Sequence, residues 1–256
     1  MADRVAPPRR RERVIILGVL LALAGLAWAL LIWQSTTMGS QGMGLTMGMG
    51  AALFIALWMV MMVAMMFPTA APMILLFSTV YARQRKQGQP FVPTWIFVSA
   101  YLLIWTLFGA LAYPLALVAE RQVGHSMWLM DHFARMVGGL LLVVGLYQLS
   151  SLKYACLSKC RTPLQFLLTS WRDGAWGAFR MGLEHGLYCL GCCWLLFVLL
   201  FPLGMMNLAL LALLTVLIYA EKALPVGRRI GQAVGVLLMG YGALVLFLPA
   251  WLPMAR

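Results

Sequence analysis

The stretch "HGLYCLGCCW", which runs from His185 to Trp194, places one histidine and three cysteines in an otherwise apolar segment. On a helix, His185, Cys189, Cys192 and Cys193 would form one stripe, because residues three and four apart share a face. Thiolate and imidazole are soft ligands that favour Cu(I) or Zn²⁺ over Mg²⁺ or Ca²⁺. The stripe predicts a soft-metal site, with Cu(I) as the first choice and zinc as the second.

Two other interpretations of the stripe remain open. Buried cysteines often pack as small apolar side chains, and His185 would then hydrogen-bond a backbone carbonyl. Alternatively, Cys189 and Cys192 have the C-x2-C spacing of a thiol–disulfide redox pair, although such enzymes usually keep the attacking thiol accessible. If neither metal nor redox chemistry applies, the chain would be a scaffold subunit of a membrane complex.

A second cysteine pair lies in "YACLSKCRTP", where Cys156 and Cys160 are four residues apart. If this segment is helical, the two thiols share a face. The neighbouring Lys159 and Arg161 are expected to lower the thiol pKa values and favour thiolate. We interpret the pair as an inner metal acceptor or donor, with two unrelated juxtamembrane cysteines as the alternative.

The whole chain has 19 methionines, and they are concentrated in its first third. Met61 and Met65, and likewise Met62 and Met66, are one helical turn apart in an apolar stretch. Thioethers bind Cu(I) without deprotonation and carry no charge into a membrane. These residues are therefore predicted metal ligands, although methionine is also an ordinary filler of apolar helices. The uncharged segment before them adds Met38, Met43, Met47 and Met49, as a metal-binding loop or a flexible linker.

Other ionisable residues have simpler interpretations. Glu184 is expected to pair with Arg180 one turn earlier, and Glu221-Lys222 to mark an interfacial helix end. The segment "VGHSMWLMDHFAR" contains His125, His132 and Asp131, which are an alternative capture site for a divalent ion.

The elements that must position these residues are membrane helices. The chain is 63% hydrophobic and 10% charged, whereas soluble domains are about 25% charged. Seven apolar stretches stand out, most of them near the roughly 20 residues needed to cross a bilayer: 14–33, 51–80, 94–119, 134–152, 178–201, 205–221 and 230–252. The sequence predicts an all-α, polytopic integral membrane bundle of about seven helices, with a basic tail (1–13) and one transmembrane domain (14–256).

The basic residues predict how the bundle is oriented. With the N-terminus in the cytoplasm, only Arg121, Arg135 and Arg256 of the 19 Lys and Arg residues fall outside. This bias follows the positive-inside rule and predicts a cytoplasmic N-terminus and an outside C-terminus. Because the charges of the +12 chain are spread among the spans, they leave no basic face for nucleic acid.

Three features predict how the helices pack. Pro68 and Pro72 should kink or break the second span, because each removes a backbone hydrogen bond. Gly182 and Gly186 form a GxxxG pair that allows close approach of a neighbouring helix. The short connection 202–207 suggests that the fifth and sixth spans form an antiparallel pair.

Several motifs resemble a known family, in the same order over about residues 50–228. They are "WMVMMVAMMFPTAAP", "YLLIWTLFGAL", "GLYQLSSLKYACLSKCRTPLQFL", "HGLYCLGCCWLLFVLLFPLGMMNLALLALL" and "EKALPVG". They resemble bacterial integral membrane proteins predicted to bind metal, some of which are regarded as copper chaperones for copper oxidases such as tyrosinase. The resemblance implies a multi-pass protein of the bacterial inner membrane. It places Met61, Met62, Met65, Met66, Cys156, Cys160, His185, Cys189, Cys192 and Cys193 on the family's motif positions.

Taken together, the sequence predicts copper handling rather than catalysis. No nucleophile, base and oxyanion set is present, and no Walker-type phosphate loop, so neither hydrolysis nor ATP-driven pumping by this chain alone is expected. The predicted partners are the lipid bilayer and a periplasmic or membrane cuproenzyme or metallochaperone that exchanges copper with the chain.

Overall fold

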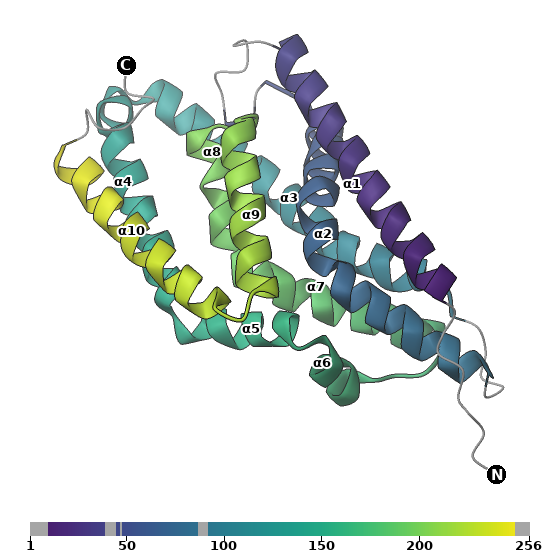
Figure 1. The fold of residues 1–256 in the computed structure, drawn as a ribbon. Coiled ribbons are helices and arrows are strands. Elements are labelled where there is room, and N and C mark those ends of the chain that lie inside the picture. Colours follow the sequence, from purple (N-terminus) through teal and green to yellow (C-terminus); the bar gives the residue numbers. More distant parts are fainter. Residues whose placement is uncertain (1–9, 39–44, 47, 87–91, 249–256) are drawn as a thin grey trace.

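The computed structural model describes residues 10–38, 45–46, 48–86 and 92–248, and every regular element in them is a helix (Figure 1). The helices are α1 (Arg10–Met38), α2 (Ala51–Lys86), α3 (Thr94–His125), α4 (Met127–Leu149), α5 (Ser151–Arg161), α6 (Pro163–Ser170), α7 (Gly174–Val198), α8 (Leu200–Leu203), α9 (Leu208–Ala223) and α10 (Gly227–Phe247). The all-α prediction is confirmed for this part of the chain.

Among the described residues, 6 helices are long and apolar enough to cross a membrane: α1, α2, α3, α4, α7 and α10. The predicted sixth span corresponds to α9, which has 16 residues. At 1.5 Å per residue it is roughly 24 Å long, against a hydrocarbon core of about 30 Å. Helix α9 is therefore a short helix within the bundle, and whether it crosses the bilayer stays a prediction.

The central packing contact joins α3 and α7. A Cβ atom on Gly182 would lie 2.4 Å from the Phe97 carbonyl oxygen, and one on Gly186 would lie 2.9 Å from Ile104. These two glycines therefore allow α3 to approach closely, which confirms the expectation from the GxxxG spacing. The contact fixes the cysteine-bearing face of α7 against α3 and α2.

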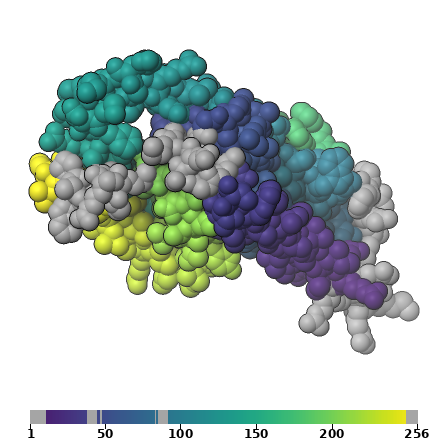
Figure 2. Space-filling view, turned by 90° about the horizontal axis from the view of Figure 1, so that it is seen from above, coloured from purple at the N-terminus to yellow at the C-terminus, as the bar shows by residue number. Residues whose placement is uncertain are grey.

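Helices α4 and α10 form a second closely packed pair, held by glycines on both sides. Gly138 and Gly145 of α4 face the backbone of α10, and Gly242 of α10 faces the Gly138 carbonyl oxygen. In Figure 1 this pair lies on the opposite side of the bundle from α1 and α2, and Figure 2 shows α1 and α4 along opposite edges. The side chains described below lie in the bundle between these two edges.

The structure corrects one packing expectation and, for α2, agrees with a kink and not with a break. Helix α9 packs against α10 and α2 instead of pairing with α7, so the predicted antiparallel pair is wrong. The chain leaves α7 through α8 and turns at Gly204, whose φ of 99° is favourable only for glycine. Helix α2 is not broken at Pro68 and Pro72 but runs through both, and Figure 1 shows its axis changing direction along its length.

A buried ion cluster joins α4, α5 and α9. The Lys153 ammonium lies 2.7 Å from the Glu221 carboxylate, and the two side chains are 0% and 2% exposed. Gln148 donates to Glu221 at 3.1 Å and accepts a hydrogen bond from Lys153. Glu221 is therefore an interior residue, and its assignment to an interfacial helix end is wrong, because Lys153 compensates its charge inside the bundle.

Candidate metal site

Cys189 lies at the centre of the predicted stripe and makes contacts with three other helices. Its Sγ atom is 3.1 Å from the hydroxyl of Tyr101 on α3 and 4.0 Å from Sδ of Met66 on α2. The ammonium of Lys222 on α9 donates a hydrogen bond to the same sulfur at 3.0 Å. The thiol is fully buried, so α2, α3, α7 and α9 converge on one soft ligand.

The separation of the Cys189 and Met66 sulfur atoms suits a shared metal ion. Two sulfur ligands at about 2.3 Å from one ion and 120° apart would be about 4.0 Å from each other. The observed 4.0 Å is compatible with this separation, and it is also the distance at which two packed sulfur atoms touch. Both donors are soft and one is neutral, which is the chemistry that favours Cu(I). This pair fits the predicted copper ion.

His185 lies one turn before Cys189 and is 3% exposed. Its ring stacks on Phe97 and Tyr101, and Phe166 meets it edge-on. Its Nδ1 atom is buried and has no hydrogen-bond partner among the described residues. Buried ring nitrogens normally have a partner, so this atom is free to act as a ligand. The interpretation of His185 as a core residue bonded to a carbonyl through Nδ1 is not supported.

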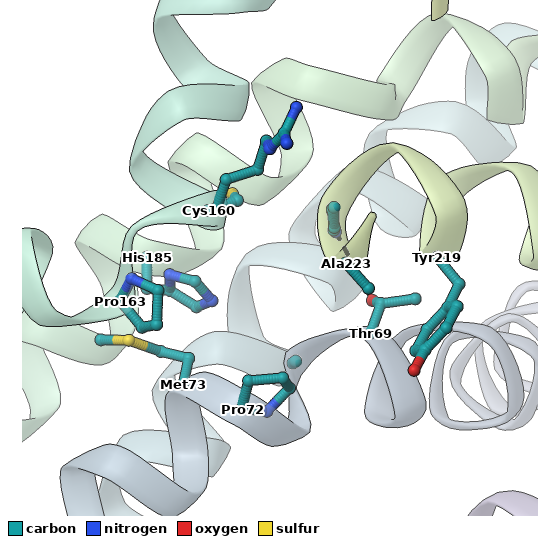
Figure 3. Close-up of a pocket in the computed structure, with 11 residues that line it drawn as sticks. Thr69, Pro72, Met73, Cys160, Pro163, His185, Tyr219 and Ala223 are labelled. Carbon is teal, nitrogen blue, oxygen red and sulfur yellow. Dashed lines mark hydrogen bonds between the residues drawn. The ribbon is translucent and has the colours of Figure 1, made fainter. Parts of the chain in front are cut away.

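A cavity of about 210 Å³ opens beside this histidine (Figure 3). His185 of α7, Cys160 of α5 and Met73 of α2 line it, together with Thr69 of α2 and Lys222 of α9. In Figure 3 the Met73, His185 and Cys160 side chains lie on one side and Thr69 and Tyr219 on the other. The cavity thus connects soft donors from three helices with the cation that contacts Cys189.

Cys160 links the cavity to the buried thiols. It is partly exposed, and its thiol interacts with those of Cys189 and Cys192. Cys156, on the same helix, packs against α7 where a Cβ on Gly191 would lie 2.8 Å from its sulfur. Both predicted inner cysteines therefore face α7.

The expected lowering of their pKa values does not occur. The neighbouring Cys189 and Cys192 raise the pKa of Cys160 well above its usual value, and burial raises the pKa of Cys156. The physical reason lies partly in Arg161, whose guanidinium donates to the carbonyl oxygens of Leu224 and Pro225 at 2.7 and 3.1 Å. Its charge is directed at the α9–α10 turn rather than at the thiols.

Cys192 and Cys193 are buried on the same helix as Cys189, but their thiols bond the backbone of that helix. Each thiol donates to the Cys189 carbonyl oxygen at 3.0 Å. No group of three His, Cys, Asp or Glu side chains is placed to hold a metal ion in the described part of the chain. The observed soft pair, Cys189 with Met66, combines a thiol with a thioether.

The four predicted methionine ligands are all in the interior. Met61, Met62, Met65 and Met66 are at most 1% exposed, and only Met66 has a sulfur contact to the cysteine stripe. Met49 is also buried, and its carbonyl oxygen accepts a hydrogen bond from Tyr113 at 3.0 Å. Met43 and Met47 lie outside the described residues, as do the N-terminal segment 1–9 and Arg256.

The alternative site at the start of α4 has no metal-binding geometry. The His132 ring stacks on Trp128 at 4.3 Å, and its Nδ1 lies 2.8 Å from the Trp128 carbonyl oxygen. His125, Asp131 and His132 form no metal-holding group. The expected Glu184–Arg180 pair is confirmed at 3.4 Å, and Arg172 joins it at 3.4 Å.

Sequence reasoning missed Lys222 and Tyr101 as neighbours of the site. Lys222 was assigned to a membrane interface, and Tyr101 was not considered. A signal was present in both cases, because an ionisable residue within or beside an apolar span is by default a functional candidate. The partner that each side chain would meet depends on the packing of α3 and α9, which the sequence does not contain.

Comparison with protein families bears on the function of the chain as a whole. Residues 55–245 match the family model described as PpoB2, copper chaperone. The chain belongs to the PpoB2 copper chaperone family. No curated protein and no solved structure matches it. Membership in the PpoB2 family supports copper handling and a partner that uses copper. The matched residues include His185, the five cysteines, Met61, Met62, Met65 and Met66, but not the Met38–Met49 segment.

Proposed function

We propose that this PpoB2-family protein is a non-catalytic copper carrier of the bacterial inner membrane, which binds Cu(I) and delivers it to a cuproenzyme. The proposal also includes the topology: seven spans, with the N-terminus in the cytoplasm and the C-terminus outside. The observation that carries it is the 4.0 Å separation of the Cys189 and Met66 sulfur atoms, in a copper chaperone family. Zinc is the second candidate ion.

The remaining ligands are assigned by their distance from this pair along the bundle. His185 supplies an unpartnered nitrogen one turn away, and Cys160 supplies a thiol from α5. Cys192, Cys193 and Cys156 are proposed as further donors, and Met61, Met62 and Met65 as relay ligands on α2. A metal held in this way is almost entirely shielded from water.

A thiol–disulfide function is less well supported. Cys189 and Cys192 are 0% and 2% exposed, while the attacking thiol of an exchange reaction must meet its substrate. A scaffold role offers no reason for the unpartnered His185 nitrogen or for a lysine directed at a thiol. Copper binding accounts for both.

The test is metal content. The detergent-purified protein is reduced, loaded anaerobically with Cu(I), and analysed by mass spectrometry beside the His185/Cys189/Cys192/Cys193 quadruple alanine variant. Near-stoichiometric copper that is lost in the variant, with equal helix content by circular dichroism, is the expected result. Equal copper in both proteins, or none in either, would overturn the proposal. A zinc-loaded sample analysed in the same way identifies the preferred ion.

A further inference from the structure

The cavity beside His185 is larger than a bare copper ion requires. Its volume of about 210 Å³ far exceeds the roughly 30 Å³ that one water molecule occupies in the liquid. A site that received only a naked ion would need space for little beyond its ligands. The cavity therefore has room for a small molecule bound to the metal.

The charges around the cavity are all of one sign. Arg161 and Lys222 line it, and no Asp or Glu is found among its described lining residues. The acidic residues next in sequence to two lining residues are paired with other cations: Glu221, before Lys222, pairs with Lys153, and Glu184, before His185, pairs with Arg172 and Arg180. The Arg161 guanidinium bonds the uncharged carbonyl groups of Leu224 and Pro225, so its formal charge is not compensated there. Two cations with no carboxylate beside them in the lining repel a positively charged aquo ion and attract an anion.

Soft metal donors also line the cavity. Cys160, Met73 and His185 line the same cavity. Cu(I) bound by two thiolates is an anion, and it exchanges its ligands only with other soft donors. The cavity offers both the positive charge that attracts such a complex and the thiol that accepts its metal.

From these observations we infer that the cavity receives Cu(I) as an anionic complex of a small thiol, with Arg161 attracting the complex and Cys160 accepting the metal. This inference rests on the proposed function, because it names the form in which the cargo arrives. One copper–sulfur bond to a carrier thiolate breaks and one to Cys160 Sγ forms. The Cys160 proton leaves with the released thiol, and copper stays Cu(I) throughout.

The experiment measures the rate of copper transfer from three small carriers to the reduced, detergent-purified protein. Cu(I) is supplied as its bis-thioglycolate complex, which carries several negative charges, as its 2-mercaptoethanol complex, which carries one, or as its acetonitrile complex, which is a cation. Transfer from thioglycolate is expected to be slowed about threefold or more in Arg161→Gln, and transfer from acetonitrile to be accelerated. The difference should shrink in 0.5 M salt, where screening extends over only a few ångströms.

Two further variants separate charge from structure. Arg161→Lys keeps the charge but loses the fork that bonds Leu224 and Pro225, so it should retain most of the rate with thioglycolate. Arg229→Gln removes the same charge from an exposed residue of α10 that does not line the cavity, and it should change the carrier preference far less than Arg161→Gln.

The outcomes are distinguishable from failure of the proposed function. If copper loads from no carrier, the proposed function itself fails. If copper loads but Arg161→Gln and Arg229→Gln respond alike to carrier charge, copper binding stands and the anionic-carrier inference is overturned.

Discussion

Two consecutive residues of α9, Glu221 and Lys222, face two different kinds of buried polar cluster. Glu221 belongs to the ion cluster with Lys153 and Gln148, in which the charges and hydrogen-bonding groups satisfy one another. Lys222 belongs to a second cluster, which it forms with Cys189, His185 and Met66 and which we term the thiol cluster. In it the Lys222 ammonium contacts the sulfur of Cys189 at 3.0 Å. The clusters are neighbours in the chain but differ in what they leave open.

The ion cluster is closed, and the thiol cluster is not. Buried charges are tolerated when they are paired and fully hydrogen-bonded. In the thiol cluster, by contrast, His185 keeps a nitrogen without a partner, and the sulfur atoms of Cys189 and Met66 contact each other only at 4.0 Å. Unused donor capacity inside a membrane bundle indicates a site for a ligand. The comparison distinguishes a structural ion cluster from the proposed metal-binding cluster.

The largest expected effect comes from breaking the ion cluster. Glu221→Gln removes one partner and leaves Lys153 buried and uncompensated, which should cost about 3–5 kcal/mol of stability. Unfolding of the detergent-solubilised protein measures this loss. Copper bound per folded molecule should stay near the wild-type value. The double variant Lys153→Met/Glu221→Leu, which removes both charges, should recover much of the stability. Equal loss in the two variants would contradict the closed-cluster interpretation.

The second largest expected effect is a loss of copper affinity. Cys189→Ser removes the thiol on which four helices converge, and copper affinity should fall more than about 100-fold, since even second-shell changes cost 10–100-fold. A competition titration with a Cu(I) chelator measures the affinity. Cys193→Ser is the comparison variant: its thiol donates to the Cys189 carbonyl oxygen and is only a secondary donor in the proposal, so its loss of affinity should be clearly smaller. Similar losses in both variants would remove Cys189 from the centre of the site.

The comparison also shows what the sequence allows one to predict. The helical stripe of His185, Cys189, Cys192 and Cys193 was predictable because helix periodicity alone fixes which side chains share a face. The glycine contact of α7 with a neighbour was predictable for the same reason. Both are properties of a single helix.

Contacts between helices were not predictable in this way. Of four similar methionines, only Met66 has a sulfur contact to Cys189, and this depends on how α2 is rotated against α7. That Glu221 and Lys222 face different clusters depends in the same way on the rotation of α9. The incorrect pairing of α7 with α9 was inferred from a short connection, but the turn at Gly204 directs α9 toward α10. Apolar membrane helices give no strong periodic signal of their partner, because lipid and protein neighbours are similarly apolar.

A smaller effect tests the methionine assignment. Met66→Leu replaces the thioether that lies 4.0 Å from Cys189, and copper affinity should weaken about tenfold, or 1.4 kcal/mol. Met61→Leu removes an equally buried thioether that has no sulfur contact to the cysteines, and it should have little effect on affinity. Both changes conserve volume and should cost less than about 1.5 kcal/mol of stability. Equal affinity losses would mean that the methionines of α2 act together and not through Met66.

The last comparison uses two glycines, one beside each cluster, and includes the smallest expected effect, that of Gly191→Ala. A Cβ on Gly231 would lie 2.9 Å from the Glu221 carboxylate, and one on Gly191 would lie 2.8 Å from the Cys156 sulfur. Each alanine gains about 0.5–1 kcal/mol of helix stability. In Gly231→Ala the carboxylate is locked by Lys153 and cannot move away, so overpacking of about 1–3 kcal/mol should leave a net loss.

In Gly191→Ala the Cys156 thiol is held by no ion pair and can rotate, so stability should change by less than about 0.5 kcal/mol. Its displaced sulfur should instead alter copper affinity by a few-fold at most. Thermal unfolding and chelator competition on both variants measure the two quantities side by side. A stability loss in Gly191→Ala as large as that in Gly231→Ala would show that the thiol cluster is as rigidly closed as the ion cluster. The distinction between a closed ion cluster and an open thiol cluster would then not hold.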